Sequence, residues 1–139
     1  MSSPAPVFLK LKEKAARSAA RSYSPYSRFP VGAAVISEEG VVYGGCNVEN
    51  ASFGLTQCAE RSALTAAICD GAKPGSLKTL VIYTPGDTAH SPCGACRQVM
   101  HELMAEDSEV ISCCDSDDRL LWAPSQYLPD PFDPSVLLK

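Results

Sequence analysis

The segment "TLVIYT" at residues 79–84 decides the fold, because it is a short and almost wholly apolar run in the middle of the chain. An apolar run of this length is typical of a strand that is buried on both faces. Helical patterns precede and follow it, at residues 58–69 and 93–104, and each of them begins with a cysteine. The alternation of helix and strand predicts a sheet with helices packed on both of its faces.

The segments on either side of this centre predict two hairpins. "VGAAVIS" (31–37) and "VVYGGCN" (41–47) are separated by so few residues that they must run antiparallel. "EVISCC" (109–114) and "RLLWA" (119–123) are joined by the tight acidic turn 115–118, which makes a second antiparallel pair. We therefore expect an α/β fold, a three-layer α/β/α sandwich with a five-stranded mixed sheet.

The two ends of the chain have different patterns. Residues 5–21 predict an amphipathic helix, with apolar residues at helical spacing. The proline-rich tail at 124–139 has no regular period, so we expect it to wrap around the surface. The helix at the N-terminus also carries a basic cluster, which we interpret as a solvated helix face. Its members are Lys10, Lys12, Lys14, Arg17 and Arg21.

Composition narrows the class of protein. The chain has 139 residues, which fits one domain over residues 1–139, and its net charge of −4 argues against a nucleic-acid binder. The sequence has no apolar run long enough to span a membrane and no signal-peptide pattern, so we expect a cytoplasmic protein. Seven cysteines in that compartment indicate metal ligands plus a few buried free thiols. The expected free thiols are Cys46, Cys69, Cys113 and Cys114.

Cys93 and Cys96 form a CxxC motif at the start of a predicted helix. Redox pairs of the thioredoxin type also lie at helix N-termini, but they need no third cysteine. A catalytic zinc takes three protein ligands and keeps a fourth position for water. Because both cysteine-led helices follow sheet elements, their N-termini are expected at one edge of the sheet. Cys58, Cys93 and Cys96 would then lie within reach of one another.

Glu60 favours a catalytic zinc site over a structural one. It lies two residues after Cys58, where it can face a metal-bound water without ligating the metal. Attack by zinc-bound hydroxide, with a carboxylate that moves protons, fits this set of residues. Arg61 is predicted to donate hydrogen bonds to the thiolates, and the alternative is an exposed helix arginine. A structural zinc would need a fourth ligand, for which the candidates are Cys46, His90 and His101.

The motifs "CAE" (58–60) and "PCGAC" (92–96) resemble the signature of the zinc nucleoside deaminases, in its three-cysteine variant. The match continues through "PYSRFPVGAAV", "GGCNVENASFGLTQCAERSAL" and "SPCGACRQVM", and extends from Ser22 to Phe132. The chain thus resembles the small homotetrameric cytidine deaminases. This resemblance implies their fold, a Zn²⁺ cofactor and the hydrolysis of cytidine and deoxycytidine to uridine and deoxyuridine with release of ammonia, in pyrimidine salvage. It also implies a nucleoside as the small-molecule partner, no nucleic-acid or membrane partner, and a homotetramer with shared active sites.

Roles for individual residues follow from this resemblance. The zinc ligands and the general acid/base would be Cys58, Cys93, Cys96 and Glu60. Phe29 would pack on the pyrimidine, and the Ala59 backbone would meet the base. Asn47 and Glu49 would hydrogen-bond the ribose hydroxyl, although turn chemistry is an alternative role for both residues. Phe132, in the tail, would reach the active site of a neighbouring subunit.

Two positions depart from the family pattern, and other functions stay open. Phe53 stands where the family often has tyrosine, and Gln57 is more polar than the usual aliphatic residue. Polynucleotide deaminases usually have histidine as the first ligand and need a basic groove, which this chain lacks. The remaining alternatives are a deaminase of a related aminonucleoside such as a nucleoside antibiotic, a structural-zinc binding module and a redox protein.

Overall fold

Strand β3 (Leu77–Tyr83) is the middle strand of a five-stranded sheet in the computed structural model, which describes residues 5–138. The strand order is β2-β1-β3-β4-β5. Leu80, Val81 and Ile82 are each buried, because helices cover both faces of the sheet. The prediction of a buried central strand is therefore confirmed, and the strand begins two residues earlier than the apolar run indicated.

The sheet is mixed, as predicted. Strand β1 (Gly32–Ile36) pairs antiparallel with β2 (Val42–Cys46) on one side and with β3 on the other. Strand β4 (Met104–Cys113) runs parallel to β3, and β5 (Arg119–Trp122) pairs antiparallel with β4. Parallel neighbours need a crossover connection, and helix α3 (Gly94–Leu103) supplies it. Both predicted hairpins are confirmed.

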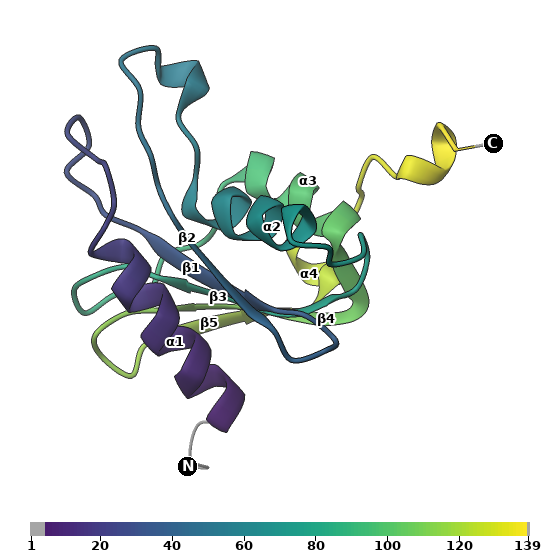
Figure 1. The fold of residues 1–139 in the computed structure, drawn as a ribbon, viewed down its shortest axis with the longest axis horizontal. Coiled ribbons are helices and arrows are strands. Elements are labelled where there is room, and N and C mark those ends of the chain that lie inside the picture. The colour runs from purple at the N-terminus through teal and green to yellow at the C-terminus, as the bar shows by residue number, and fades with distance from the viewer. Residues whose placement is uncertain (1–4, 139) are drawn as a thin grey trace.

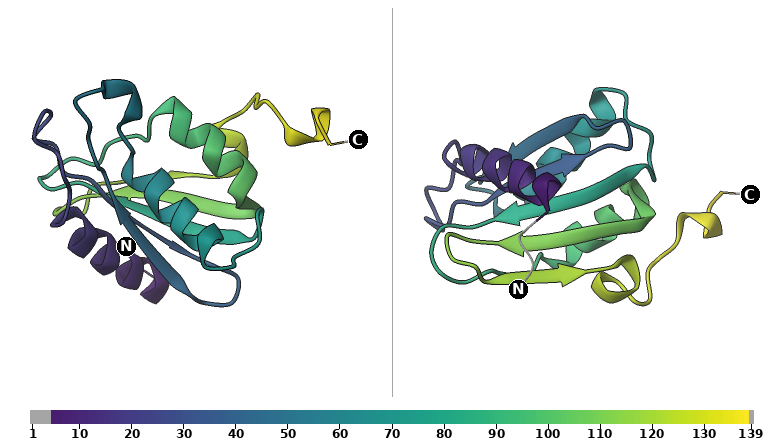
Figure 2. Two further views of the ribbon diagram at one scale, coloured as in Figure 1. Left: turned by 45° about the horizontal axis from the view of Figure 1, so that its top comes forward. Right: turned by 90° about the horizontal axis from the view of Figure 1, so that it is seen from below.

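Helices cover the two faces of the sheet unequally (Figures 1 and 2). Helix α1 (Pro6–Ala19) lies alone on one face, and it ends earlier than the sequence pattern indicated. Helix α2 (Ala59–Cys69) and α3 lie together on the opposite face. The predicted three-layer arrangement is confirmed, and it places the N-termini of α2 and α3 on the same side of the sheet.

Two glycines let the helices pack directly on strand backbone. A Cβ atom at Gly32 would lie 1.8 Å from the carbonyl oxygen of Ala15, on α1. A Cβ atom at Gly45 would lie 2.5 Å from the backbone nitrogen of Ala63, on α2. Backbone atoms cannot move aside as a flexible side chain can. These two positions therefore fix the depth at which each helix packs on the sheet.

Each face of the sheet has its own apolar core. Beneath α2 and α3 the core includes Val35, Leu64, Leu80, Met100 and Val110. Beneath α1 it includes Phe8, Leu11, Val81 and Ile111. Alternate residues of β3 contribute to opposite cores, as the period of two in a strand requires. A strand buried on both faces must be apolar along its whole length, and this explains the pattern in "TLVIYT".

Two segments project from this body (Figure 1). The loop between β2 and α2 carries the short helix η1 (Phe53–Leu55), and the tail leads away from the sheet beyond Tyr127 to η2 (Pro134–Val136). The prediction of a wholly irregular surface tail was wrong, because Pro124–Tyr127 forms helix α4 and Tyr127 is 2% exposed. Within residues 5–138, the helices are all too short or too polar to span a membrane.

Candidate active site

The N-termini of α2 and α3 bring three cysteines together. Cys58 is the N-cap of α2 and Cys93 is the N-cap of α3, while Cys96 lies in the first turn of α3. Their sulfur atoms all lie within 4.8 Å of one another. The Cys93 sulfur is 3.9 Å from that of Cys58 and 3.2 Å from that of Cys96. The predicted meeting of the two motifs is therefore present in the structure.

The chemistry of this cluster fits a zinc ion. Three thiols at one point offer the soft sulfur ligands that zinc binds in proteins. The Cys96 thiol and then the Arg61 guanidinium hold the pKa of Cys58 at about 5. Hydrogen bonding to Cys58, followed by burial, holds the pKa of Cys96 above its usual range. Three thiolates this close repel one another, and a bound divalent cation would offset that repulsion.

Arg61 lies beside the cluster, as predicted. Its Nη2 atom donates to the Cys58 sulfur over 3.3 Å and to the Thr56 carbonyl over 3.5 Å. The side chain is half-buried, and its Nε atom is buried without a hydrogen-bond partner among residues 5–138. A buried cation with a free donor next to sulfur indicates a site built to hold negative charge. The alternative of an exposed helix arginine is wrong.

The candidates for a fourth protein ligand lie elsewhere. Within the described part of the chain, the only group of histidine, cysteine and acidic side chains with metal-binding geometry is the three-cysteine cluster. Cys46, His90 and His101 do not belong to it, and His101 instead contacts Asp133 over 3.8 Å. A closed four-ligand structural site therefore has no support from the geometry. An open site with three ligands is the arrangement that catalytic zinc requires.

Glu60 is buried next to the cluster. Its residue is 5% exposed and it lies in the first turn of α2. Burial raises the pKa of its carboxyl group, and the charge of the neighbouring Cys58 raises it further. A carboxyl group whose pKa is raised toward neutrality can both accept and release a proton during a reaction.

The cluster opens into a cavity of about 160 Å³ at the edge of the sheet. Four of the predicted site residues line it, namely Phe29, Asn47, Ala59 and Glu60. Cys58 lines it as well, so the cavity connects the metal ligands to the predicted base-binding wall. Residues that lie far apart in the sequence thus meet around one small space.

Asn47 holds one wall of this cavity in place. Its side chain donates to the Phe29 carbonyl over 2.9 Å and accepts from the Val31 amide over 2.9 Å and from the Ser22 hydroxyl. The turn role considered for Asn47 is therefore present in the structure. Its amide nitrogen has a second hydrogen, which is available to a ligand in the cavity.

Glu49 lies next to the cavity rather than in its wall. It lines an adjacent hollow with Tyr26, Ser27 and Phe53. Its carboxylate accepts from the Tyr26 and Ser27 amides over 2.9 and 3.1 Å and from the Ser27 hydroxyl. These hydrogen bonds, led by the one from the Ser27 hydroxyl, lower the pKa of Glu49, so the side chain is ionised at neutral pH.

Phe132 lies outside the cavity of its own chain. The tail is fastened to α3, because Gln98 donates to the Phe132 carbonyl over 2.9 Å. The residue is nevertheless 61% exposed. The backbone is thus held while the aromatic ring faces away from its own core.

The sequence did not single out Thr84 and Ser91 of the cavity wall, and it indicated His90 only as a candidate fourth zinc ligand. Thr84, His90 and Ser91 come from the loop between β3 and α3. His90 stacks edge-on against Phe29, with ring centroids 5.4 Å apart. The one available signal was the position of this loop, which follows the carboxyl end of the central strand and leads into the CxxC motif.

The four remaining cysteines are free thiols, but not all are buried as predicted. Cys113 and Cys114 are buried, whereas Cys46 is half-buried and Cys69 is exposed. Cys69 ends helix α2 on the face that points away from the sheet, so it has no core to join. The prediction of burial is wrong for Cys69.

The fold and the site together define a class of protein, a zinc-dependent enzyme in which three clustered cysteines lie beside a buried carboxyl group. Comparison with known proteins narrows this class. Residues 8–113 match the family model described as the cytidine and deoxycytidylate deaminase zinc-binding region. This match covers most of the chain, so the protein belongs to that family.

Individual relatives agree with this assignment. The chain is 45% identical to a cytidine deaminase of Sporosarcina psychrophila over 94 residues, which is 68% of each protein. It is 41% identical to a probable cytidine deaminase of Dictyostelium discoideum over 84% of this chain and 78% of that protein. The crystal structure of a cytidine deaminase from Burkholderia pseudomallei superimposes with a TM-score of 0.84 at 42% identity, covering 89% of this chain and 98% of that one.

Proposed function

We propose that this protein catalyses the hydrolytic deamination of cytidine and deoxycytidine to uridine and deoxyuridine, with release of ammonia. The enzyme is zinc-dependent, and its reaction is a step of pyrimidine salvage. The observation that carries the proposal is the buried Glu60, which lines one small cavity together with Cys58 of the three-cysteine cluster. The family match and the cytidine deaminases at 41–45% identity support the choice of substrate.

Cys58, Cys93 and Cys96 would hold the zinc, which when bound supplies a Lewis acid that makes a water molecule nucleophilic at neutral pH. Arg61 holds the Cys58 sulfur and balances part of the thiolate charge. The N-termini of α2 and α3 add partial positive charge at the same point. These groups stabilise the ligand set in its charged form.

Glu60 moves the protons. Its carboxylate accepts a proton from the attacking water and delivers it to the ring nitrogen N3, while the new C–O bond forms at C4. It then takes the proton of the added hydroxyl group and delivers it to the amine, so that the C4–N bond breaks and ammonia leaves. One carboxylate serves both transfers, which requires a pKa close to the working pH. Burial moves the pKa of Glu60 in that direction.

The cavity wall would position the substrate. Phe29 packs against one face of the pyrimidine, with His90 fixing the orientation of the Phe29 ring. The Ala59 backbone lies beside Glu60 and would contact the base. Asn47 has a free amide hydrogen for the ribose hydroxyl, and Glu49 lies in the adjacent hollow where the sugar would extend.

The test is incubation of the zinc-loaded protein with cytidine and with deoxycytidine. Both substrates should lose their absorbance in favour of the uridine spectrum while ammonia is released in equal amount. Glu60→Gln serves as the control, because the amide keeps the shape of the side chain but cannot transfer protons. Release of no ammonia by a zinc-loaded, folded protein would rule out the proposal and leave a zinc-stabilised binding module.

The assembly and location form the second part of the proposal. The protein forms a homotetramer in the cytoplasm, and Phe132 of one subunit covers the cavity of another. The exposed ring on a fastened tail supports this arrangement, since the backbone is held by Gln98 while the ring has no core of its own. An aromatic side chain of this size gains most when it packs against another surface.

Complementation tests the sharing of sites. Phe132→Ala and Glu60→Ala subunits, each weakly active alone, are refolded together. Mixed oligomers then contain some sites with an intact Glu60 from one chain and an intact Phe132 from another, so activity should recover. If mixed oligomers form and activity does not recover, Phe132 serves its own chain or none.

A further inference from the structure

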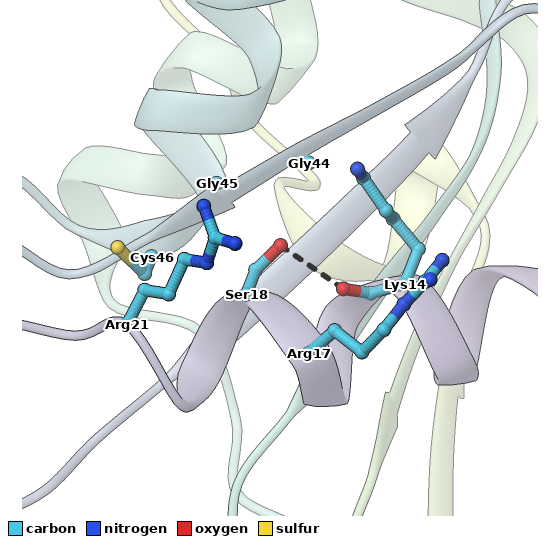
Figure 3. Close-up of a pocket in the computed structure, with 7 residues that line it drawn as sticks. All are labelled: Lys14, Arg17, Ser18, Arg21, Gly44, Gly45 and Cys46. Carbon is cyan, nitrogen blue, oxygen red and sulfur yellow. Dashed lines mark hydrogen bonds between the residues drawn. The ribbon is translucent and has the colours of Figure 1, made fainter.

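Three residues of the basic cluster, two in α1 and one in the turn that follows it, line a hollow of about 380 Å³ that is separate from the cysteine cluster. They are Lys14, Arg17 and Arg21, and they face Gly44, Gly45 and Cys46 of the edge strand β2 across the hollow. Figure 3 shows the side chain of Lys14 on α1 and that of Arg21 just beyond the helix, both pointing toward β2, with Ser18 between them. Arg17 and Arg21 are exposed, as the interpretation of a solvated face requires, while Lys14 is half-buried.

The three cations have no acidic partner among residues 5–138. The ion pairs in this part of the chain are Lys78 with Asp107 and His101 with Asp133. Lys14 is half-buried, while Arg17 and Arg21 are exposed. The net charge of the whole chain is −4, so this hollow is locally positive in a protein that is negative overall.

The free edge of β2 lies beside this hollow. At the two ends of the β1–β2 ladder, Ser37 donates to the Val41 carbonyl and Asn47 donates to the Val31 carbonyl. Hydrogen-bonded pairs alternate along an antiparallel ladder, so the N–H and the C=O of Gly44 both point to the free edge of the sheet. The Lys14 side chain lies over Gly44, where a Cβ atom would lie 2.7 Å from Lys14 Cε.

We propose that the hollow between α1 and the edge strand β2 binds the phosphate groups of a small multi-anionic ligand. Arginine guanidinium groups match phosphate oxygens with two parallel hydrogen bonds, and lysine adds a mobile point charge. Ser18, whose side chain also lines the hollow, adds a hydroxyl group. The ligand class is a compound with two or more linked phosphates, either inorganic pyrophosphate or a nucleoside triphosphate. This site is independent of the deaminase reaction.

An alternative explanation is that the cations only protect the free edge of β2 from pairing with other chains, as charged side chains often do. The two explanations differ in what they require. Edge protection needs positive charge near the strand, whereas a phosphate site needs these particular cations and the open floor. The basic cluster offers a matched control, because Lys10 and Lys12 belong to the same helix but do not line the hollow.

The experiment titrates zinc-loaded protein with pyrophosphate, with ATP and with adenosine as the uncharged probe. Calorimetry gives the affinities, and amide spectra of ¹⁵N-labelled protein give the location. Pyrophosphate and ATP should bind saturably and shift the amide signals of Gly44, Gly45 and Cys46, while adenosine should not bind. Equal affinities assign the site to free phosphate groups, and tighter binding of ATP assigns it to a nucleotide.

Two double variants distinguish specific binding in the hollow from non-specific attraction by positive charge. Arg17→Ser with Arg21→Ser should weaken binding by about tenfold or more, because two close charges are lost. Lys10→Ser with Lys12→Ser removes the same net charge and should change the affinity by less than about threefold. Gly44→Ala keeps all cations and should also weaken binding. Absence of saturable binding, equal losses in both double variants, or shifts centred on the cysteine cluster would overturn the proposal.

Discussion

Arg61→Ala tests whether the guanidinium group holds the metal ligands. In the structure, the Arg61 Nη2 atom lies 3.3 Å from the Cys58 sulfur, and the charge of Arg61 helps to keep the pKa of Cys58 at about 5. Alanine removes this donor and its positive charge. The Cys58 thiolate would then lose a hydrogen bond and a neighbouring positive charge, and zinc would be released more easily.

The magnitude follows from the contact. A hydrogen bond that involves a charged group contributes about 1.5–3 kcal/mol, and a tenfold change in affinity corresponds to about 1.4 kcal/mol. Loss of the single contact from Arg61 to Cys58 therefore weakens zinc binding by roughly 10–100-fold. Because the side chain is half-buried rather than fully buried, we expect a value near the lower end of this range.

The assay follows zinc transfer from the protein to a coloured chelator, which needs no enzyme activity. Arg61→Lys keeps the charge but not the planar fork, so it should give an intermediate release rate. Lys73→Ala, in the exposed turn after α2, is the control for loss of one positive charge. Thermal unfolding of the zinc-loaded variants checks the fold. If Arg61→Ala releases zinc at the wild-type rate, the contact does not support the metal site and the reasoning fails.

Three further predictions concern the same region. Glu60→Gln should keep zinc and fold while turnover falls by about 10²–10⁴-fold, as measured by elemental analysis and ammonia release; turnover near the wild-type rate would remove Glu60 from the mechanism. Gly45→Ala should lower the free energy of unfolding by about 1–3 kcal/mol, because its Cβ would lie 2.5 Å from the Ala63 backbone nitrogen, and a denaturant titration measures this. Removal of zinc by a chelator should lower the melting temperature, since the metal binds only the folded cluster, and Cys93→Ser should show no such shift.

The sheet and its helices could be predicted from the sequence because their patterns are local. The centre of strand β3, residues 80–82, is apolar, and the short turns at 38–40 and 115–118 force antiparallel pairs. The cysteine cluster could be predicted as well, since both motifs follow strands and helix N-termini must meet at one edge. The physics of these features depends on short stretches of sequence and on chain connectivity.

Helix α4 could not be predicted in this way. The segment "PSQY" is one turn long and has no measurable period. It forms because the Gln126 side chain accepts from the Ala123 amide over 2.7 Å and because Tyr127 is buried in the core under α2 and α3. Burial against distant elements decides this helix, and such contacts leave no trace in a local pattern.

The cavity wall formed by the loop 84–91 could not be predicted for the same reason. Hydrogen bonds from this loop to the acidic turn 115–118 give that turn a structural role. The carboxylate of Asp115 accepts from the Gly86 amide over 2.8 Å and from the Tyr83 hydroxyl over 2.5 Å. Asp118 accepts from the Ala89 amide over 2.9 Å, next to His90. The turn 115–118, which the sequence shows only as a tight connection between two strands, therefore also holds the loop 84–91 in position.

The cavity is thus held from two sides. Asn47 fixes the backbone on either side of Pro30 through Phe29 and Val31, and the acidic turn fixes the loop that carries His90. The two walls meet where the His90 ring packs edge-on against the ring of Phe29. Asn47 and the acidic turn each adjoin strands of the sheet, and the core sets the position of these strands. A substrate base that enters therefore meets a wall already in place, which reduces the ordering that binding requires.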